Sequence, residues 1–239
     1  MMPEYSPTLA VVTGLIEVAA GIFTLSGPGR KALLRTVAAI LFLLAGYQFA
    51  EVAVCARPGT LALSRLAFFV ILWLPPVGIR LVVELADRRA KGLRAVSRLY
   101  FGAAAGLAVW ILADPGCITR SVCQVVMARY FPEAAFDIAY GVFYQTGLLI
   151  MVFGAGALMA SSSNALARKH LTNVQLGVLG FMFPALAVRV LADEPAGLLP
   201  SVMCHFAVVL AASLLALVVR ERRAAGAVPE ITAYRPSVS

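Results

Sequence analysis

Residues 32–56 read ALLRTVAAILFLLAGYQFAEVAVCA, a run in which Arg35 and Glu51 are the only charged side chains. A transmembrane helix needs about 20 largely apolar residues to cross about 30 Å of hydrocarbon. The run is long enough to do so. A helix is the expected spanning form, because it satisfies every backbone N–H within its own segment.

Runs of the same kind fill most of the chain, which has 239 residues, 61% of them apolar and 13% charged. The mean hydropathy is +0.89, which is typical of a polytopic membrane protein and not of a soluble domain. We predict an all-α bundle of seven transmembrane helices over residues 1–223, followed by a disordered cytoplasmic tail, residues 224–239. The predicted spans are residues 7–26, 32–56, 61–85, 95–113, 137–160, 171–192 and 196–220.

The basic residues predict how the bundle is oriented. Fourteen lie at one set of span ends and in the tail, against five at the opposite ends. The positive-inside rule therefore predicts an outside N-terminus and a cytoplasmic C-terminus, in a multi-pass protein of a bacterial inner membrane. The same residues account for the net charge of +8. They are expected to meet anionic lipid headgroups, and no patch indicates nucleic-acid binding.

The second run carries the clearest polar pattern. Gln48, Glu51 and Cys55 recur at i, i+3 and i+7, so they share one helical face. A charged glutamate at membrane depth costs a few kcal/mol, so Glu51 is expected to face the bundle. Arg65 or Arg189 is its expected counterion. Helical rise places Glu51 about 8 Å below the outer boundary.

Polar side chains reach a similar depth in other predicted spans. Together they predict a polar pocket in the outer half, covered by the long segment 114–136, in which a short amphipathic helix is expected around residues 122–130. The alternative interpretation is that these residues form hydrogen bonds and ion pairs that only hold the bundle together. The predicted ligand-binding residues are Gln48, Glu51, Arg65, Tyr144, Arg189 and His205.

Two titratable residues and a pair of prolines give further structural expectations. Glu17 lies near the middle of the first span and is expected to form one interhelical hydrogen bond. His170 follows Arg168 and Lys169 at a cytoplasmic helix end, where it is expected to be solvated. The adjacent Pro75-Pro76 is expected to kink the third span, because proline removes a backbone hydrogen bond.

The chain has four cysteines, all predicted to lie toward the outer side, where oxidising conditions favour a disulfide. The candidates are Cys117, Cys123 and Cys55, with Cys117 expected to bond either of the other two; sequence alone leaves this choice open. There is no Cys-x-x-Cys, His-x-x-x-His or Glu-x-x-His motif, so we assign no metal and name no cofactor.

The pattern Gly46-Tyr47-Gln48-x-x-Glu51-x-x-x-Cys55, followed by Leu74-Pro75-Pro76, resembles an uncharacterised group of bacterial seven-helix membrane proteins. The predicted topology is also similar to that of seven-helix sensor modules of bacterial histidine kinases. Neither resemblance implies a catalytic set. The last predicted span has no lysine, which excludes a retinal protein that needs a Schiff base there.

The favoured function is therefore a non-enzymatic, receptor-like membrane protein that binds a small polar ligand in its outer half. Its expected partners are the lipid bilayer, that ligand, and a membrane or cytoplasmic protein that receives the signal. Three alternatives stay open: a small transporter for an ion or metabolite, a membrane-embedded metal or thiol redox enzyme, and an auxiliary subunit without a pocket. The transporter requires polar residues that continue into the cytoplasmic half.

Overall fold

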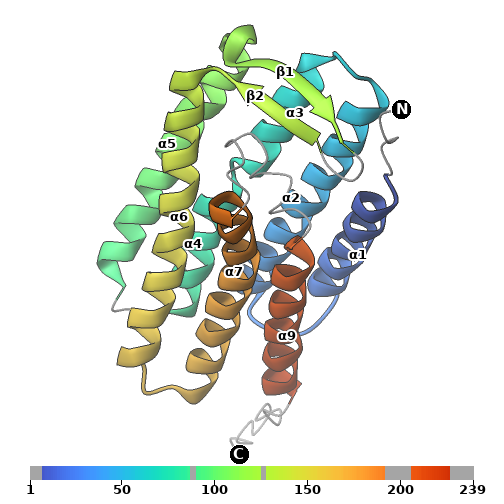
Figure 1. Cartoon of the computed structure of the whole chain (residues 1–239). Helices are drawn as coiled ribbons and strands as arrows, with labels where there is room; N and C mark the ends of the chain where they lie inside the picture. Colours follow the sequence, from blue (N-terminus) through green and yellow to red (C-terminus); the bar gives the residue numbers. More distant parts are fainter. Residues whose placement is uncertain (1–6, 87–89, 125–127, 192–205, 227–239) are drawn as a thin grey trace, which may run out of the picture.

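The computed structural model describes residues 7–86, 90–124, 128–191 and 206–226, and this part of the chain is mostly helical (Figure 1). The tail predicted from residue 224 falls outside it from residue 227 onward, and residues 224–226 are helical. The helices are α1 (Thr8–Leu25), α2 (Lys31–Ala56), α3 (Leu61–Ile71), α4 (Leu74–Leu85), α5 (Lys91–Ala113), α6 (Ala134–Ser161), α7 (Ala165–Leu191) and α9 (Ala207–Gly226).

Five helical segments of the described chain are long and apolar enough to cross a membrane. They are α1, α2, the combined α3–α4 segment Leu61–Leu85, α5 and α6. These correspond to the first five predicted runs, so the prediction of apolar spanning helices is confirmed for them. Their length and composition are those of a multi-pass membrane protein.

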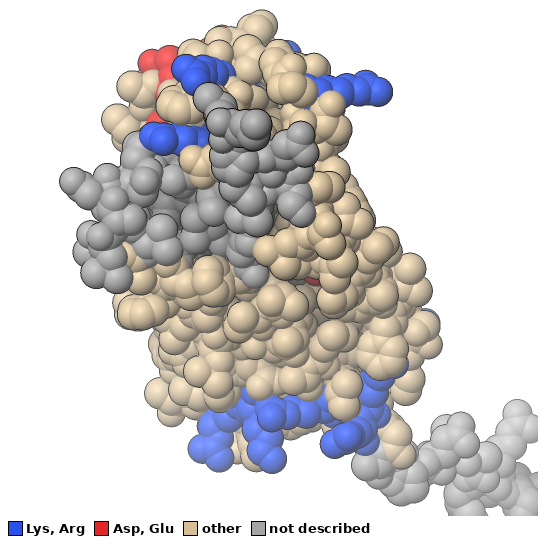
Figure 2. All heavy atoms as spheres, turned by 45° about the vertical axis from the view of Figure 1, so that its right-hand side comes forward, with Lys and Arg blue, Asp and Glu red and all other residues tan. Residues whose placement is uncertain are grey.

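The surface agrees with this composition. In Figure 2, Lys and Arg gather toward the two ends of the molecule, and a broad belt of other residues separates them. Large apolar side chains such as Leu99, Val109, Ile138 and Phe153 are exposed on the bundle. Contiguous apolar exposure of this kind is what a lipid-facing surface requires.

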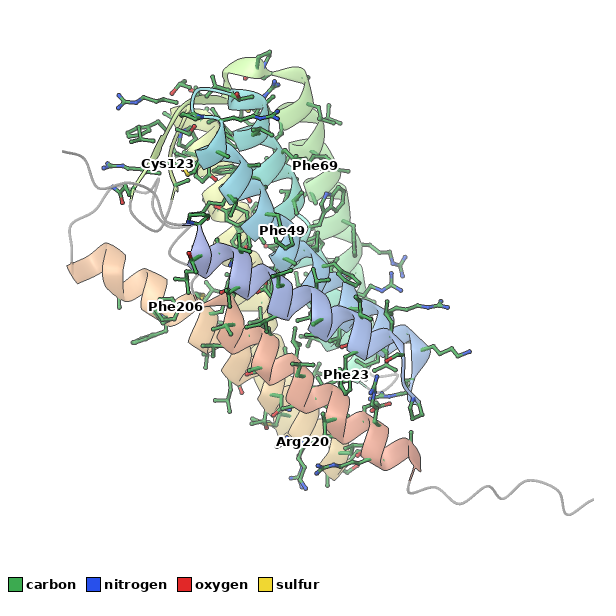
Figure 3. All side chains as sticks on the ribbon, turned by 90° about the vertical axis from the view of Figure 1, so that its right-hand side faces the viewer. Phe23, Phe49, Phe69, Cys123, Phe206 and Arg220 are labelled. Atoms are coloured by element: carbon green, nitrogen blue, oxygen red, sulfur yellow. A yellow bond between two sulfur atoms is a disulfide. The ribbon has the colours of Figure 1, made fainter. Side chains whose placement is uncertain are left out.

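Helices α1 and α2 run antiparallel in close contact, because glycines on α1 make room for aromatic rings on α2. A Cβ added at Gly14 would lie 3.0 Å from Cζ of Phe49, and one at Gly21 would lie 2.8 Å from Cε1 of Phe42. Helix α9 packs beside α1 and also against α7 (Figure 3). The first helix of the bundle thus packs against the last described helix.

The third predicted span is interrupted, as Pro75-Pro76 predicted. Helix α3 ends at Ile71, and α4 begins at Leu74 with both prolines in its first turn. First-turn residues need no N–H for the helical ladder, so proline fits there and not in the middle of a helix. The break therefore falls at Leu72 and Trp73.

The segment between α5 and α6 contains a hairpin and not the expected helix. Strands β1 (Ile118–Cys123) and β2 (Ala128–Pro132) pair in an antiparallel sheet across one end of the bundle (Figure 1). The prediction of an amphipathic helix around residues 122–130 is therefore wrong, whereas the described chain as a whole is mostly helical, as the all-α prediction requires. β-branched residues such as Ile118, Thr119 and Val122 favour extended backbone. We call this the hairpin end, and the end where α9 finishes the tail end.

Two helices begin at side-chain caps, which explains where the loops stop. The Glu133 carboxylate accepts hydrogen bonds from the N–H groups of Ala135 and Phe136 and starts α6. The Asn164 side chain accepts from Leu166 and Ala167 and starts α7. Each cap satisfies N–H groups that have no acceptor inside the helix.

Candidate functional site at the junction of helix and hairpin

The polar face predicted on α2 is buried and lies against the hairpin. Gln48 and Glu51 are only 3% and 1% exposed. Oε1 of Glu51 accepts a hydrogen bond of 2.8 Å from the backbone N–H of Ala128, the first residue of β2. Cys55, one turn further along the same face, forms a disulfide with Cys123, the last residue of β1. The spacing i, i+3, i+7 therefore brings a carboxylate and a covalent link to one hairpin.

The bond from Ala128 compensates part of the cost of burying Glu51. A hydrogen bond to a charged group contributes about 1.5–3 kcal/mol, more than a neutral pair does. The prediction assigned this role to an arginine. The described residues place a backbone N–H at Oε1, which becomes available because a strand begins at that point. The side chain of Arg189 lies outside the described part, so its pairing with Glu51 stays a prediction.

Arg65 does not form the predicted ion pair with Glu51. In the described part of the chain the ion pairs are Arg30–Glu221, Arg80–Glu84 and His170–Glu221. The Nε atom of Arg65 is buried, and no described atom accepts a hydrogen bond from it. The prediction that Arg65 is the counterion of Glu51 is therefore wrong.

Tyr144 belongs to an aromatic cluster beneath the hairpin. Its ring stacks on that of Tyr140 with centroids 5.8 Å apart. Tyr140 in turn lies 5.0 Å from the ring of Phe68, which also meets the ring of Tyr130 from β2 at 5.2 Å. Tyr144 thus contacts an aromatic ring from α6, and its predicted role in a polar pocket stays a prediction.

The remaining two predicted ligand-binding residues are not placed. The backbone of Arg189 belongs to α7, but the structure does not describe its side chain. His205 lies outside the described residues. The structure therefore brings Gln48 and Glu51 to one buried face, shows no ion pair between Arg65 and Glu51, and places Tyr144 in an aromatic cluster that extends to Tyr130 of β2.

The disulfide joins a different pair from the expected one. Cys55 and Cys123 are bonded, with their Cα atoms 5.6 Å apart, and Cys117 is a buried free thiol. The prediction that Cys117 would be bonded is wrong, because the hairpin carries Cys123 to the end of α2. Burial raises the pKa of the Cys117 thiol, and the Asp114 charge adds to this effect against the opposing charge of Arg65. The thiol form is unreactive.

Sequence reasoning missed an ionic cluster at the tail end. Glu221 of α9 accepts a bidentate pair of hydrogen bonds from Arg30, 2.8 Å from Nε to Oε1 and 3.1 Å from Nη2 to Oε2. Nδ1 of His170 lies 3.8 Å from Oε2 of Glu221. His170 is completely buried, so the prediction that it is solvated is wrong. No local pattern signals a contact between Arg30 and Glu221, which are 191 positions apart.

An open cavity of about 500 Å³ adjoins this cluster. Polar groups line it where Arg30 and Glu221 meet the cap of α7, and apolar residues of α7 and α9 line most of the rest. The lining residues are Gly29, Arg30, Asn164, Leu166, Ala167, Glu221, Ala224 and Ala225. Because the Arg30 charge is already neutralised by Glu221, the cavity offers no free charge of either sign from that pair.

Burial and charge act on both titratable members of the cluster. Burial lowers the pKa of His170, and the charges of Arg30 and Arg220 lower it further against the opposing effect of Glu221. Burial raises the pKa of Glu221, but the hydrogen bonds and charge of Arg30, together with His170, outweigh burial and leave it lowered. Acidification therefore opposes the folded state at both residues.

We expect the folded protein to lose stability as the pH falls below about 6.5, the ordinary pKa of histidine. The unfolded chain then binds a proton that the buried His170 resists, and stability rises with pH wherever the unfolded state binds more protons. Glu221 acts in the same direction below its ordinary value of 4.5. The midpoint of thermal unfolding, measured from pH 8 to 5.5, should fall in wild type and fall less in His170→Asn. Parallel curves for the two proteins would contradict this assignment.

Within the described residues there is no group of three or more His, Cys, Asp or Glu side chains that could hold a metal ion.

Comparison with known proteins gives no match: no protein family and no curated protein is detectably similar to this chain in sequence.

Proposed function

We propose that this chain is a receptor-like membrane protein that binds a small ligand where α2 meets the hairpin. The observation that carries the proposal is the hydrogen bond from the Ala128 N–H to the buried Glu51 carboxylate. A backbone N–H is a neutral donor. A ligand with an ammonium or guanidinium group is a stronger partner for a carboxylate and competes with Ala128 for it.

The disulfide gives such a ligand a defined effect on the hairpin. Cys123 at the end of β1 is covalently tied to Cys55, whereas the start of β2 is held to α2 by the bond to Glu51. A ligand that takes the carboxylate releases β2 while β1 stays attached. Gln48, on the same face, is the proposed second contact, and Arg189 and His205 stay proposed members of the site.

We also propose seven spans, with the hairpin end outside and the tail end in the cytoplasm. Helices α7 and α9 extend beside the five apolar segments (Figure 1), and the excess of basic residues predicts this orientation. The disulfide then lies on the oxidising side, as in a bacterial inner membrane. An impermeant thiol reagent should label Thr60→Cys in intact cells and Lys91→Cys only after permeabilisation. The reverse pattern would invert the topology.

The ligand proposal is tested by thermal unfolding of the purified protein with small amines, guanidinium compounds, amino acids and small acids. A ligand at 100 times its Kd stabilises the folded state by about 2.7 kcal/mol. A cationic compound should raise the midpoint of wild type and leave Glu51→Gln unchanged. The matched control is Glu84→Gln, which alters a carboxylate paired with Arg80 away from the hairpin; it should respond like wild type. Equal shifts in wild type and Glu51→Gln would refute the site.

A transporter is the second candidate, and one observation favours it. Buried polar residues do not stop in the hairpin half: Glu17 lies at mid-depth, and His170, Asn173 and Glu221 are buried toward the tail end. A transporter requires polar groups at both depths. Accumulation of the ligand inside proteoliposomes would favour transport, since a receptor binds the ligand without moving it.

A further inference from the structure

Glu17 is a buried carboxyl group that has no hydrogen-bond partner among the described residues. It lies in the middle of α1 and is completely buried, and neither of its oxygen atoms has a hydrogen-bond partner in the described part of the chain. The expected interhelical hydrogen bond is therefore absent from that part. The other two buried carboxylates differ in this respect, since Glu51 accepts from Ala128 and Glu221 from Arg30.

The surroundings of Glu17 on α2 are apolar. Gly14 and Gly21, which flank Glu17 on the same face of α1, are covered by Phe49 and Phe42. These two contacts place Glu17 opposite residues 45–46. Residues 36–46 of α2 contain no titratable side chain, and the next residue, Tyr47, is buried but forms no hydrogen bond with Glu17.

The surroundings on α9, the other described helix packed against α1, are apolar as well. Residues 207–219 of α9 contain no titratable side chain. The Arg222 guanidinium lies over the Phe23 ring at 3.9 Å, about 9 Å along the helix from Glu17. On the hairpin side Glu51 is about 8 Å further along the axis. No described charge on either helix therefore faces Glu17 directly.

The chemistry of this position favours a proton as occupant. A charged carboxylate buried among apolar groups without a donor costs several kcal/mol, and protonation removes that charge. Ca²⁺ and Mg²⁺ need about six oxygen ligands and Zn²⁺ about four ligands, and the described residues hold no group of three or more His, Cys, Asp or Glu side chains that supplies them. A proton needs neither further ligands nor additional volume between the packed rings.

We propose that Glu17 is an intramembrane proton-binding site, occupied while α1 is packed against α2 and α9 and emptied when that contact loosens. Its position supports this role, because it lies between the Glu51 junction at the hairpin end and the cluster of Arg30, His170 and Glu221 at the tail end. Release of the proton creates an unpaired charge and so favours separation of α1. The site is independent of whether a ligand binds at Glu51.

The test uses dicyclohexylcarbodiimide, an apolar reagent that adds to protonated carboxyl groups and leaves a stable N-acylurea. The full-length protein in lipid nanodiscs is treated from pH 6 to pH 10, and the adducts are located by mass spectrometry. We expect an adduct on Glu17 at pH 6 that decreases at least tenfold by pH 10. Glu17→Asp should keep the adduct and Glu17→Gln should lose it, while Glu51→Gln should label at position 17 like wild type.

The pH dependence of the adduct on Glu17 in wild type tests the proposal even if a variant folds poorly. No adduct on Glu17 at pH 6, in a protein that elutes as a single folded species, would overturn the proposal. An adduct of unchanged yield between pH 6 and pH 10 would also overturn it, because the carboxyl would then hold its proton permanently. Infrared spectra give a second readout: a protonated-carboxyl band should disappear as the pH rises in wild type and be missing in Glu17→Gln.

Discussion

We expect Cys55→Ser to lower the free energy of unfolding by about 2–4 kcal/mol. The disulfide to Cys123 closes a loop across 68 positions. A cross-link of this length removes about 4 kcal/mol of chain entropy from an unstructured unfolded state. Helices that stay inserted in the membrane reduce that value, because they already restrict the unfolded chain. The variant keeps the bond from Ala128 to Glu51 between the hairpin and α2.

Thermal unfolding with and without a reductant measures this effect. Reduced wild type should unfold at the midpoint of Cys55→Ser, and reductant should not change the variant. Cys117→Ala is the matched control, because its thiol is free, and it should remain as sensitive to reductant as wild type. Cys55→Ser and Glu51→Gln should combine non-additively, since both loosen the same hairpin. If reductant does not change the thermal unfolding midpoint of wild type, that result would contradict the disulfide between Cys55 and Cys123.

We expect Gly147→Leu to lower the free energy of unfolding by about 3 kcal/mol, at the upper end of the usual cost of overpacking. A Cβ at Gly147 of α6 would lie 2.5 Å from Cβ of Pro75 and 3.0 Å from Cε1 of Tyr100. The proline ring is rigid and sits in the first turn of α4, so it cannot rotate away. The larger side chain must therefore push α6 from α4.

Gly141→Leu is the matched control for this prediction. It makes the same change in the same helix, but nothing lies within 4 Å of a Cβ at Gly141. We expect its unfolding free energy to stay within about 0.5 kcal/mol of wild type. Chemical denaturation of both variants in the same detergent gives the comparison. Equal losses would show that α6 tolerates leucine poorly at any position, and the contact with Pro75 would not be the cause.

Part of the candidate site was predictable from residue spacing. The positions of Gln48, Glu51 and Cys55 share a face of any helix, and all three follow from a local period. Which groups meet that face was not predictable, because the partners come from β1 and β2 more than 65 positions later. The cluster of Arg30, His170 and Glu221 was missed for the same reason, since no member has a nearby partner in sequence.

The sequence by itself determined the apolar helices, the break at Pro75-Pro76 and the buried face of α2. Each depends on local properties: the length of an apolar run, the missing N–H of proline and the helical period. Only the tertiary structure decided that Cys55 bonds Cys123 and that Glu51 accepts a backbone N–H. It also decided that Glu17 is buried with no hydrogen-bond partner in the described part of the chain. Those outcomes depend on which distant segments pack together, and the free energy of packing is shared among many contacts that no local pattern encodes.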